Sequence, residues 1–170
     1  MMLDVTLGIF AGLLLPTGWA KLRKPYETAR ALRSVGWPGN RTLALALGLI
    51  EVVVGLLVLG IGSVPSVIAL GALYGGFLLW LAVAFRTGGV VSSCGCAGTP
   101  DTPPTAAHTI LNIAALATVA IDLSSSRPGI SLPSASLLEW TTIVAIIVVG
   151  SWLALTLITS GARLTGILRS

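Results

Sequence analysis

Five apolar stretches, each close to the length of a helix that crosses a bilayer, dominate this 170-residue sequence. A helix needs about 20 residues to span the hydrocarbon core of a membrane. The stretches cover residues 3–20, 42–62, 65–85, 105–123 and 137–160. Because the apolar runs are continuous rather than alternating, helices are favoured over a β-barrel.

The composition excludes a soluble domain. Hydrophobic residues make up 55% of the chain and charged residues only 9%, which is more apolar than a soluble domain of this length can bury. We therefore expect an all-α integral membrane protein, with a four-helix transmembrane bundle plus a fifth C-terminal transmembrane helix. The lipid bilayer is its first partner.

Basic residues gather between the first two spans. Six of the ten Lys and Arg residues lie within residues 21–41: Lys21, Arg23, Lys24, Arg30, Arg33 and Arg41. We expect the protein to lie in the inner (plasma) membrane of the cell. By the positive-inside rule, this basic segment is then on the cytoplasmic side. Five spans then put the N-terminus outside and the C-terminus in the cytoplasm, with Arg127 the one basic residue outside. The net charge of +4 thus reflects orientation in the membrane, and no nucleic-acid partner is expected.

The chain divides into a membrane domain over residues 1–123, a Ser/Pro-rich loop over 124–136, and an additional C-terminal helix with a short tail over 137–170. Within the basic segment, Ala29, Leu32 and Val35 share one face of a short helix predicted after Pro25, which we expect to lie on the lipid headgroups. Two glycine pairs have the spacing that lets membrane helices approach closely. These are Gly8 with Gly12 and Gly71 with Gly75.

The loop over residues 86–104 contains the only two cysteines, Cys94 and Cys96, with Gly95 between them. Gly95 widens the conformations open to the backbone, so the two sulfurs can meet in a small strained ring that is easily reduced. Strained disulfides of this kind are the labile or catalytic ones. Three interpretations remain open: thiol redox chemistry, a Cu(I) ion held by two thiolates, and cysteines that merely fill space. A closed zinc site lacks ligands, so no resident metal is expected.

Ionisable residues inside the spans are costly and therefore point to a site. Glu51 lies near the middle of the second span and must face the bundle interior, either as an acid that joins helices or as a proton relay for thiol exchange. Lys21 ends the first span and either reaches toward a carboxylate in the bundle or anchors the helix at the interface. His108 and Asn112 share one face of the fourth span, just after the cysteines. His108 is the candidate base for an attacking thiol, or a helix-end histidine in interfacial water.

Together these elements resemble the family of the methylamine utilisation protein MauE, within a wider MauE/DoxX group of redox-associated membrane proteins. The resemblance covers about residues 3–123. It rests on five features: the Gly18-Trp19-Ala20-Lys21-Leu22 end of the first span, the Val35-Gly36-Trp37-Pro38 end of the basic segment, Glu51, the Cys94-Gly95-Cys96 loop and Asn112. It implies a four-helix membrane protein, similar in plan to thiol oxidoreductases of the vitamin K epoxide reductase and DsbB type. It also implies that Cys94 and Cys96 are the redox pair.

The sequence thus predicts a membrane thiol–disulfide redox protein that supports disulfide formation or reduction in a partner protein. Since the chain has no second cysteine pair, electrons must come from or go to a thioredoxin-fold partner or a bound quinone. The alternative is a non-enzymatic scaffold or assembly factor for a redox complex, and a small transporter that uses Glu51 is a third possibility.

The expected orientation conflicts with a role in making disulfides outside the cell. The charge distribution places the cysteine loop on the cytoplasmic side, whereas disulfide supply to exported proteins requires the oxidising side. Either the orientation is inverted, or the pair accepts electrons from cytosolic thioredoxin-like proteins and passes them outward.

Overall fold

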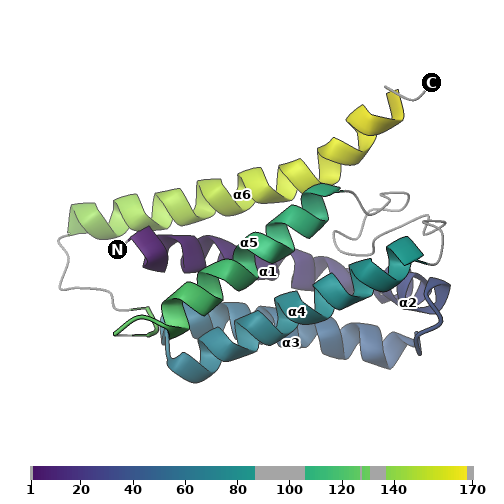
Figure 1. The fold of residues 1–170 in the computed structure, drawn as a ribbon, viewed down its shortest axis with the longest axis horizontal. Coiled ribbons are helices and arrows are strands. Elements are labelled where there is room, and N and C mark those ends of the chain that lie inside the picture. The colour runs from purple at the N-terminus through teal and green to yellow at the C-terminus, as the bar shows by residue number, and fades with distance from the viewer. Residues whose placement is uncertain (1, 87–105, 127, 131–136, 168–170) are drawn as a thin grey trace.

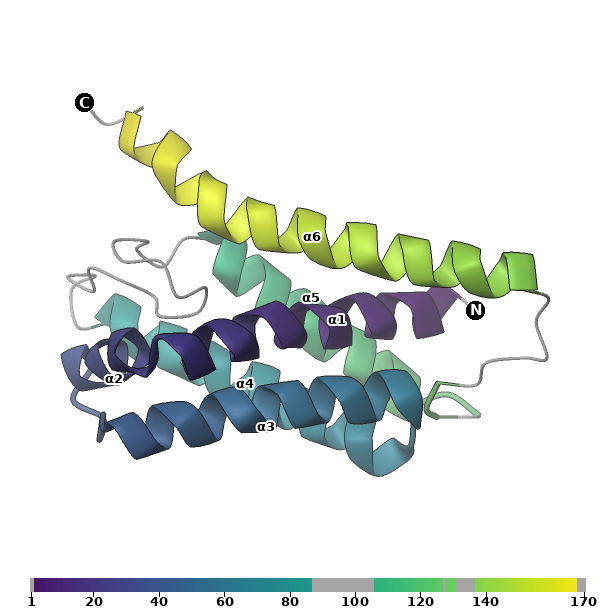
Figure 2. The same cartoon turned by 180° about the vertical axis from the view of Figure 1, so that it is seen from behind.

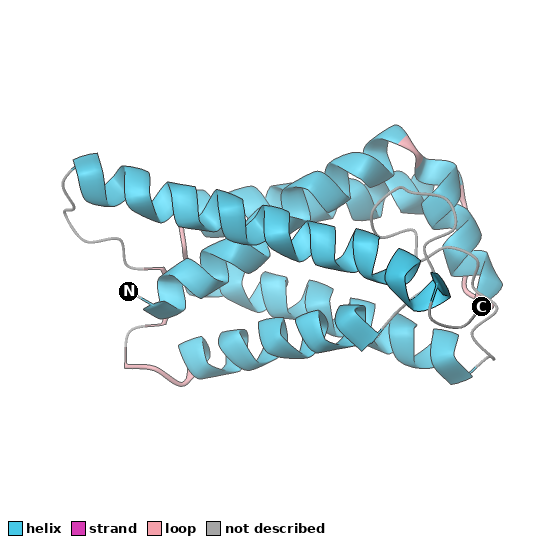
Figure 3. Ribbon diagram, turned by 90° about the horizontal axis from the view of Figure 1, so that it is seen from above, coloured by secondary structure: helices cyan, strands magenta, loops and turns pink. Residues whose placement is uncertain are grey.

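A computed structural model describes residues 2–86, 106–126, 128–130 and 137–167, and all regular structure in these residues is helical (Figures 1 and 3). The helices are α1 (Met2–Arg23), α2 (Pro25–Ser34), α3 (Arg41–Gly60), α4 (Val64–Arg86), α5 (Ala106–Leu123) and α6 (Leu137–Ile167). In this part of the chain, five helices, all except α2, are long and apolar enough to cross a membrane. The expectation of an all-α integral membrane protein is confirmed.

The core lies between α1, α3, α4 and α5. Its fully buried members include Leu7 and Leu14 of α1, Val58 of α3 and Leu70 of α4. The predicted four-helix arrangement is therefore held together by interdigitated aliphatic side chains, and aromatic contacts add to it. Tyr74 of α4 lies edge-on to a ring of α1, with 5.7 Å between the two ring centroids.

The fifth span, α6, packs along α1 on the outside of the four-helix unit (Figures 1 and 2). The Ser151 hydroxyl donates a hydrogen bond of 2.9 Å to the Ile9 carbonyl. A Cβ atom on Gly12 would lie 2.5 Å from the Ser151 Oγ, so a larger residue there would force the Ser151 side chain to move. The pair Gly8 and Gly12 thus serves the packing of α6, while Gly71 faces Val119 of α5.

The short helix α2 starts at Pro25, as the sequence predicts, and Ala29, Leu32 and Val35 are all buried. Its apolar face covers protein rather than lipid headgroups alone, because Leu32 belongs to a buried cluster with Trp80, Leu81 and Ala84 of α4. Helix α2 therefore closes one end of the bundle (Figure 2).

The opposite end is held together by hydrogen bonds to the backbone of residues 129 and 130. Gly62 turns the chain between α3 and α4 with a φ of +60°, and its carbonyl accepts a 2.9 Å hydrogen bond from the Ile130 amide. The buried Asp122 carboxylate accepts a 2.8 Å hydrogen bond from the Gly129 amide. A side chain at Gly62 would meet the Ile130 backbone, so this close approach requires glycine.

Arg86 at the end of α4 and Ala106 at the start of α5 both lie at the end of the bundle that α2 closes (Figure 1). The segment that carries Cys94 and Cys96 joins these two helix ends, and both cysteines lie outside the described residues.

Candidate functional site: a buried ion pair beside a cavity

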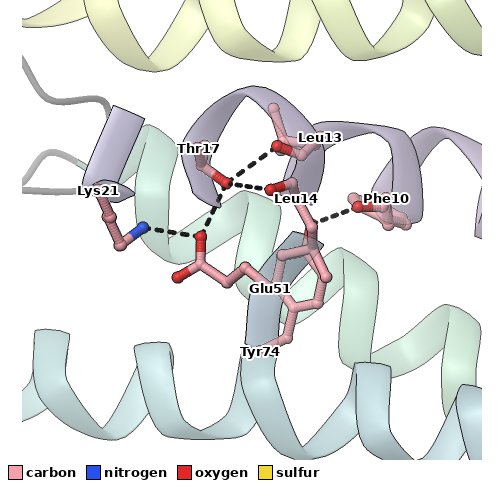
Figure 4. Close-up of polar contacts among 7 residues, drawn as sticks. All are labelled: Phe10, Leu13, Leu14, Thr17, Lys21, Glu51 and Tyr74. Atoms are coloured by element: carbon pink, nitrogen blue, oxygen red, sulfur yellow. Dashed lines mark hydrogen bonds and ion pairs between the residues drawn. The ribbon is translucent and has the colours of Figure 1, made fainter. Parts of the chain in front are cut away.

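Glu51 is fully buried in α3 and is paired with two side chains of α1 (Figure 4). Its Oε2 accepts a hydrogen bond of 2.9 Å from the Lys21 ammonium, and the Thr17 Oγ1 lies 3.1 Å from the same oxygen. The other carboxylate oxygen, Oε1, is buried without a hydrogen-bond partner in the described part of the protein. One side of this carboxylate is therefore satisfied and the other is not.

Close contact between α1 and α3 makes this geometry possible. Thr17 and Lys21 are four residues apart, so they lie on one face of α1. A Cβ atom on Gly18 would lie 2.7 Å from the Gly48 carbonyl oxygen, and one on Gly48 would lie 2.9 Å from the Gly18 carbonyl oxygen. Since neither glycine can carry a side chain without moving a backbone, the two helices meet closely enough for Thr17 to approach Glu51.

The positive charge of Lys21 and the negative charge of Glu51 balance each other inside the apolar bundle. The Lys21 side chain is only 4% exposed, and its ammonium also lies 5.5 Å from the centroid of the Phe77 ring, within cation–π range. A single charge at this depth is costly, whereas a hydrogen-bonded pair carries no net charge into the membrane. The pair therefore fastens α1 to α3 without making the interior electropositive.

A cavity of about 210 Å³ lies beside the ion pair, between α1, α2, α4 and α5, with Ile158 contributed by α6. Its walls are mainly leucine and aromatic side chains. The polar side chains that reach its lining are those of Thr17, Lys21, Thr28, Tyr74, Trp80, His108 and Asn112.

Two polar atoms of cavity-lining residues are buried without a partner among the described residues: the Asn112 Oδ1, an acceptor, and the Trp80 Nε1, a donor. Both side chains are more than nine-tenths buried. Tyr74 differs, because its hydroxyl donates a 2.8 Å hydrogen bond to the Phe10 carbonyl. Buried polar groups normally have partners, so these two atoms leave unused hydrogen-bonding capacity in residues that line the cavity.

The structure brings some of the predicted site residues together. Lys21 meets the bundle carboxylate Glu51, as one of the two interpretations expected. His108 is 4% exposed at the start of α5, and it lines the cavity together with Lys21 and Asn112. The Asn112 amide donates a 2.6 Å hydrogen bond to the His108 carbonyl. The catalytic roles of Cys94, Cys96, His108 and Glu51 stay predictions.

Three residues of this site were not predicted from the sequence: Thr17, Tyr74 and Trp80. Neutral hydroxyls and indoles are common in membrane helices, and nothing in an apolar run tells which of them faces the interior. Thr17 is the one that could have been found, because it precedes Lys21 by one helical turn. Within the described residues, no three His, Cys, Asp or Glu side chains are grouped so that they could hold a metal ion.

The chain matches a known protein family. The model of the family described as methylamine utilisation protein MauE matches residues 1–125, which include α1 to α5 and leave out α6. Neither curated proteins nor solved structures gave a match to the chain.

Proposed function

Because this chain belongs to the MauE family of methylamine utilisation membrane proteins, we propose that it is a thiol–disulfide redox protein that cycles Cys94 and Cys96 between dithiol and disulfide. The observation that carries the proposal is the Cys94-Gly95-Cys96 sequence in a segment whose two ends, Arg86 and Ala106, lie at the end of the bundle that α2 closes. His108 follows Ala106 by two residues and lines the cavity.

The proposed reaction is an exchange with a partner protein through a mixed disulfide. A partner dithiol loses two electrons and two protons and becomes a disulfide, while the bond between Cys94 and Cys96 is reduced to two thiols. The reverse reaction reduces the partner. A thioredoxin-fold protein is the proposed partner, since such proteins present a reactive cysteine pair at their surface.

His108 is proposed as the base that takes the proton from the attacking thiol. Its position in the first turn of α5 supports this role, because it follows the cysteine segment directly and is buried from bulk water. Glu51 is proposed as the residue that holds Lys21 and α1 in place, and a proton relay through its unpartnered Oε1 is the further role that the sequence suggested.

We also propose an orientation of the bundle in the membrane. Six basic residues lie at the end of the bundle that α2 closes, namely Lys21, Arg23, Lys24, Arg30, Arg33 and Arg41, and Arg86 ends α4 there. By the positive-inside rule this end faces the cytoplasm, which places the exchange with the partner on that side of an inner membrane.

The test is a single-turnover exchange with reduced thioredoxin as the probe. Purified, fully oxidised protein in lipid nanodiscs should consume one thioredoxin dithiol per chain, and the C94S/C96S variant should consume none. Single C94S and C96S variants should show which cysteine forms the mixed disulfide, and S93A, which keeps both thiols, is the matched control.

Equal thioredoxin oxidation by the wild type and by C94S/C96S would overturn the proposal. No oxidation by either protein, with unchanged assembly of a partner complex around the C94S/C96S variant, would favour the scaffold alternative instead.

A further inference from the structure

The two orphaned polar atoms of the cavity have complementary chemistry. The Asn112 Oδ1 can only accept a hydrogen bond, and the Trp80 Nε1–H can only donate one. A hydroxyl group donates one hydrogen bond and accepts others, so it has the chemistry that each of the two atoms requires.

The two atoms come from neighbouring helices, and both side chains line the same cavity. Gly71 of α4 faces Val119 of α5, and Gly75 faces Leu116. One further turn along each helix brings Trp80 to about the level of Asn112. The register of α4 against α5 therefore brings these two cavity-lining side chains to a similar level along the bundle.

The charge and the lining of the cavity limit further which class of ligand fits it. Because the Lys21 charge is balanced by Glu51, the cavity does not select an anion. Tyr74, Phe77 and Trp80 supply aromatic surface, and Tyr74 and Phe77 already contact each other edge-on with centroids 6.0 Å apart. Rings pack well against such edges and faces.

The cavity is large enough to hold a six-membered ring of a ligand. An apolar cavity of about 150 Å³ is large enough to bind benzene, and this cavity has about 210 Å³. The outer surface of the bundle exposes many large apolar side chains, as a lipid-facing surface does, so the bilayer is the natural source of a lipophilic occupant.

We propose that this cavity binds a neutral, ring-bearing lipophilic alcohol or phenol from the bilayer, whose hydroxyl donates to the Asn112 Oδ1 and accepts from the Trp80 Nε1–H. This binding site goes beyond the proposed thiol exchange and does not depend on it. Ile158 of α6 completes the wall, so the C-terminal helix outside the family match takes part in the site.

The experiment compares two probes on the full chain in nanodiscs, namely 4-heptylphenol and its methyl ether 4-heptylanisole, in competition against radiolabelled 4-heptylphenol. The two probes share ring and tail, but only the phenol can donate a hydrogen bond. We expect saturable binding of one phenol per chain and about tenfold weaker binding of the anisole, as the loss of one buried hydrogen bond predicts.

Two variants assign the contacts. Asn112→Leu should weaken the phenol about tenfold and abolish the difference between the probes, whereas Trp80→Phe should weaken both probes and keep that difference. Trp152→Phe, at an indole that is 61% exposed on α6, is the control and should change neither. Binding should persist in C94S/C96S, which separates this site from the thiol chemistry.

Absence of saturable binding would overturn the proposal. Equal affinity for phenol and anisole in the wild type would overturn it too, because the orphaned atoms would then be satisfied by ordered water rather than by the ligand hydroxyl. The probe comparison needs no substitution, so it holds even if a variant fails to fold.

Discussion

At the scale of single residues, the pair of Lys21 and Glu51 shows how a membrane bundle carries charge. Each side chain is buried, and the hydrogen bond of 2.9 Å between them joins α1 to α3. The sequence predicted that Glu51 faces inward, because a carboxylate near the middle of a span must avoid lipid. It left the partner of Lys21 open, since the choice depends on how closely α1 and α3 approach.

Removing one member of the pair should cost more than removing both. K21M leaves the Glu51 carboxylate buried without its cation, so we expect a loss of about 3 kcal/mol in the free energy of unfolding, with a similar loss for E51L. The double variant K21M/E51L should lose less than either single variant, because neither charge is then left buried alone. Unfolding in mixed micelles measures all three, and K24M, at an exposed lysine, is the control that should stay within about 0.5 kcal/mol of the wild type. Additive losses would show that the pair is not coupled.

The hydroxyl of Tyr74 gives a second residue-scale prediction. It donates a 2.8 Å hydrogen bond to the Phe10 carbonyl inside the bundle, so Y74F should lower the free energy of unfolding by about 1 kcal/mol. The other tyrosine, Tyr26, is 68% exposed, and Y26F is the matched control. If both variants unfold alike, the buried hydrogen bond contributes nothing to stability.

At the scale of elements, the sequence predicted all five long helices, and their limits differ from the observed ones by a few residues except at the end of α6, which extends to Ile167. Apolar runs of about 20 residues leave few alternatives in a membrane. The surface on which α2 packs was not predictable, because an amphipathic helix fits lipid headgroups and a protein surface equally well.

The tightest helix contact was also hidden in the sequence. The pairs Gly8/Gly12 and Gly71/Gly75 have the expected spacing, but the close contact of α1 with α3 is made by Gly18 and Gly48, one from each helix. A motif within one helix is visible in a sequence, whereas a glycine on each of two helices is visible only once the helices are paired.

Substitution of Gly48 tests that contact. G48A places a Cβ atom 2.9 Å from the Gly18 carbonyl oxygen, so the helices must separate, and we expect a loss of about 1–3 kcal/mol in the free energy of unfolding. Gly60 lies in the same helix, and a Cβ atom added there would have no neighbour within 4 Å, so G60A should be neutral or slightly stabilising. Equal effects of G48A and G60A would contradict the close α1–α3 contact.

At the scale of the whole molecule, the segments of α1, α2 and α3 that carry the described basic residues lie at one end of the bundle, and the turn that directly follows α5 lies at the other (Figure 1). The positive-inside rule then gives the orientation, and the orientation decides which compartment supplies the partner.

Cysteine labelling in intact cells tests this orientation. In a C94S/C96S background, Ser126→Cys, in the exposed loop after α5, should react with a membrane-impermeant maleimide from outside. Lys24→Cys, exposed at the other end, should react only after the cells are opened. The reverse pattern would mean that the bundle is inverted and that the cysteine segment faces the oxidising side.

The central claim concerns the two cysteines, so the most direct measurement is a redox titration of Cys94 and Cys96 in the purified protein, by thiol trapping and mass spectrometry across a series of glutathione or dithiothreitol ratios. We predict a reversible two-electron transition to an intramolecular disulfide, at a potential above the roughly −300 mV that marks inert structural disulfides. A pair that never closes, or that stays reduced with a metal ion bound, would contradict the proposed function.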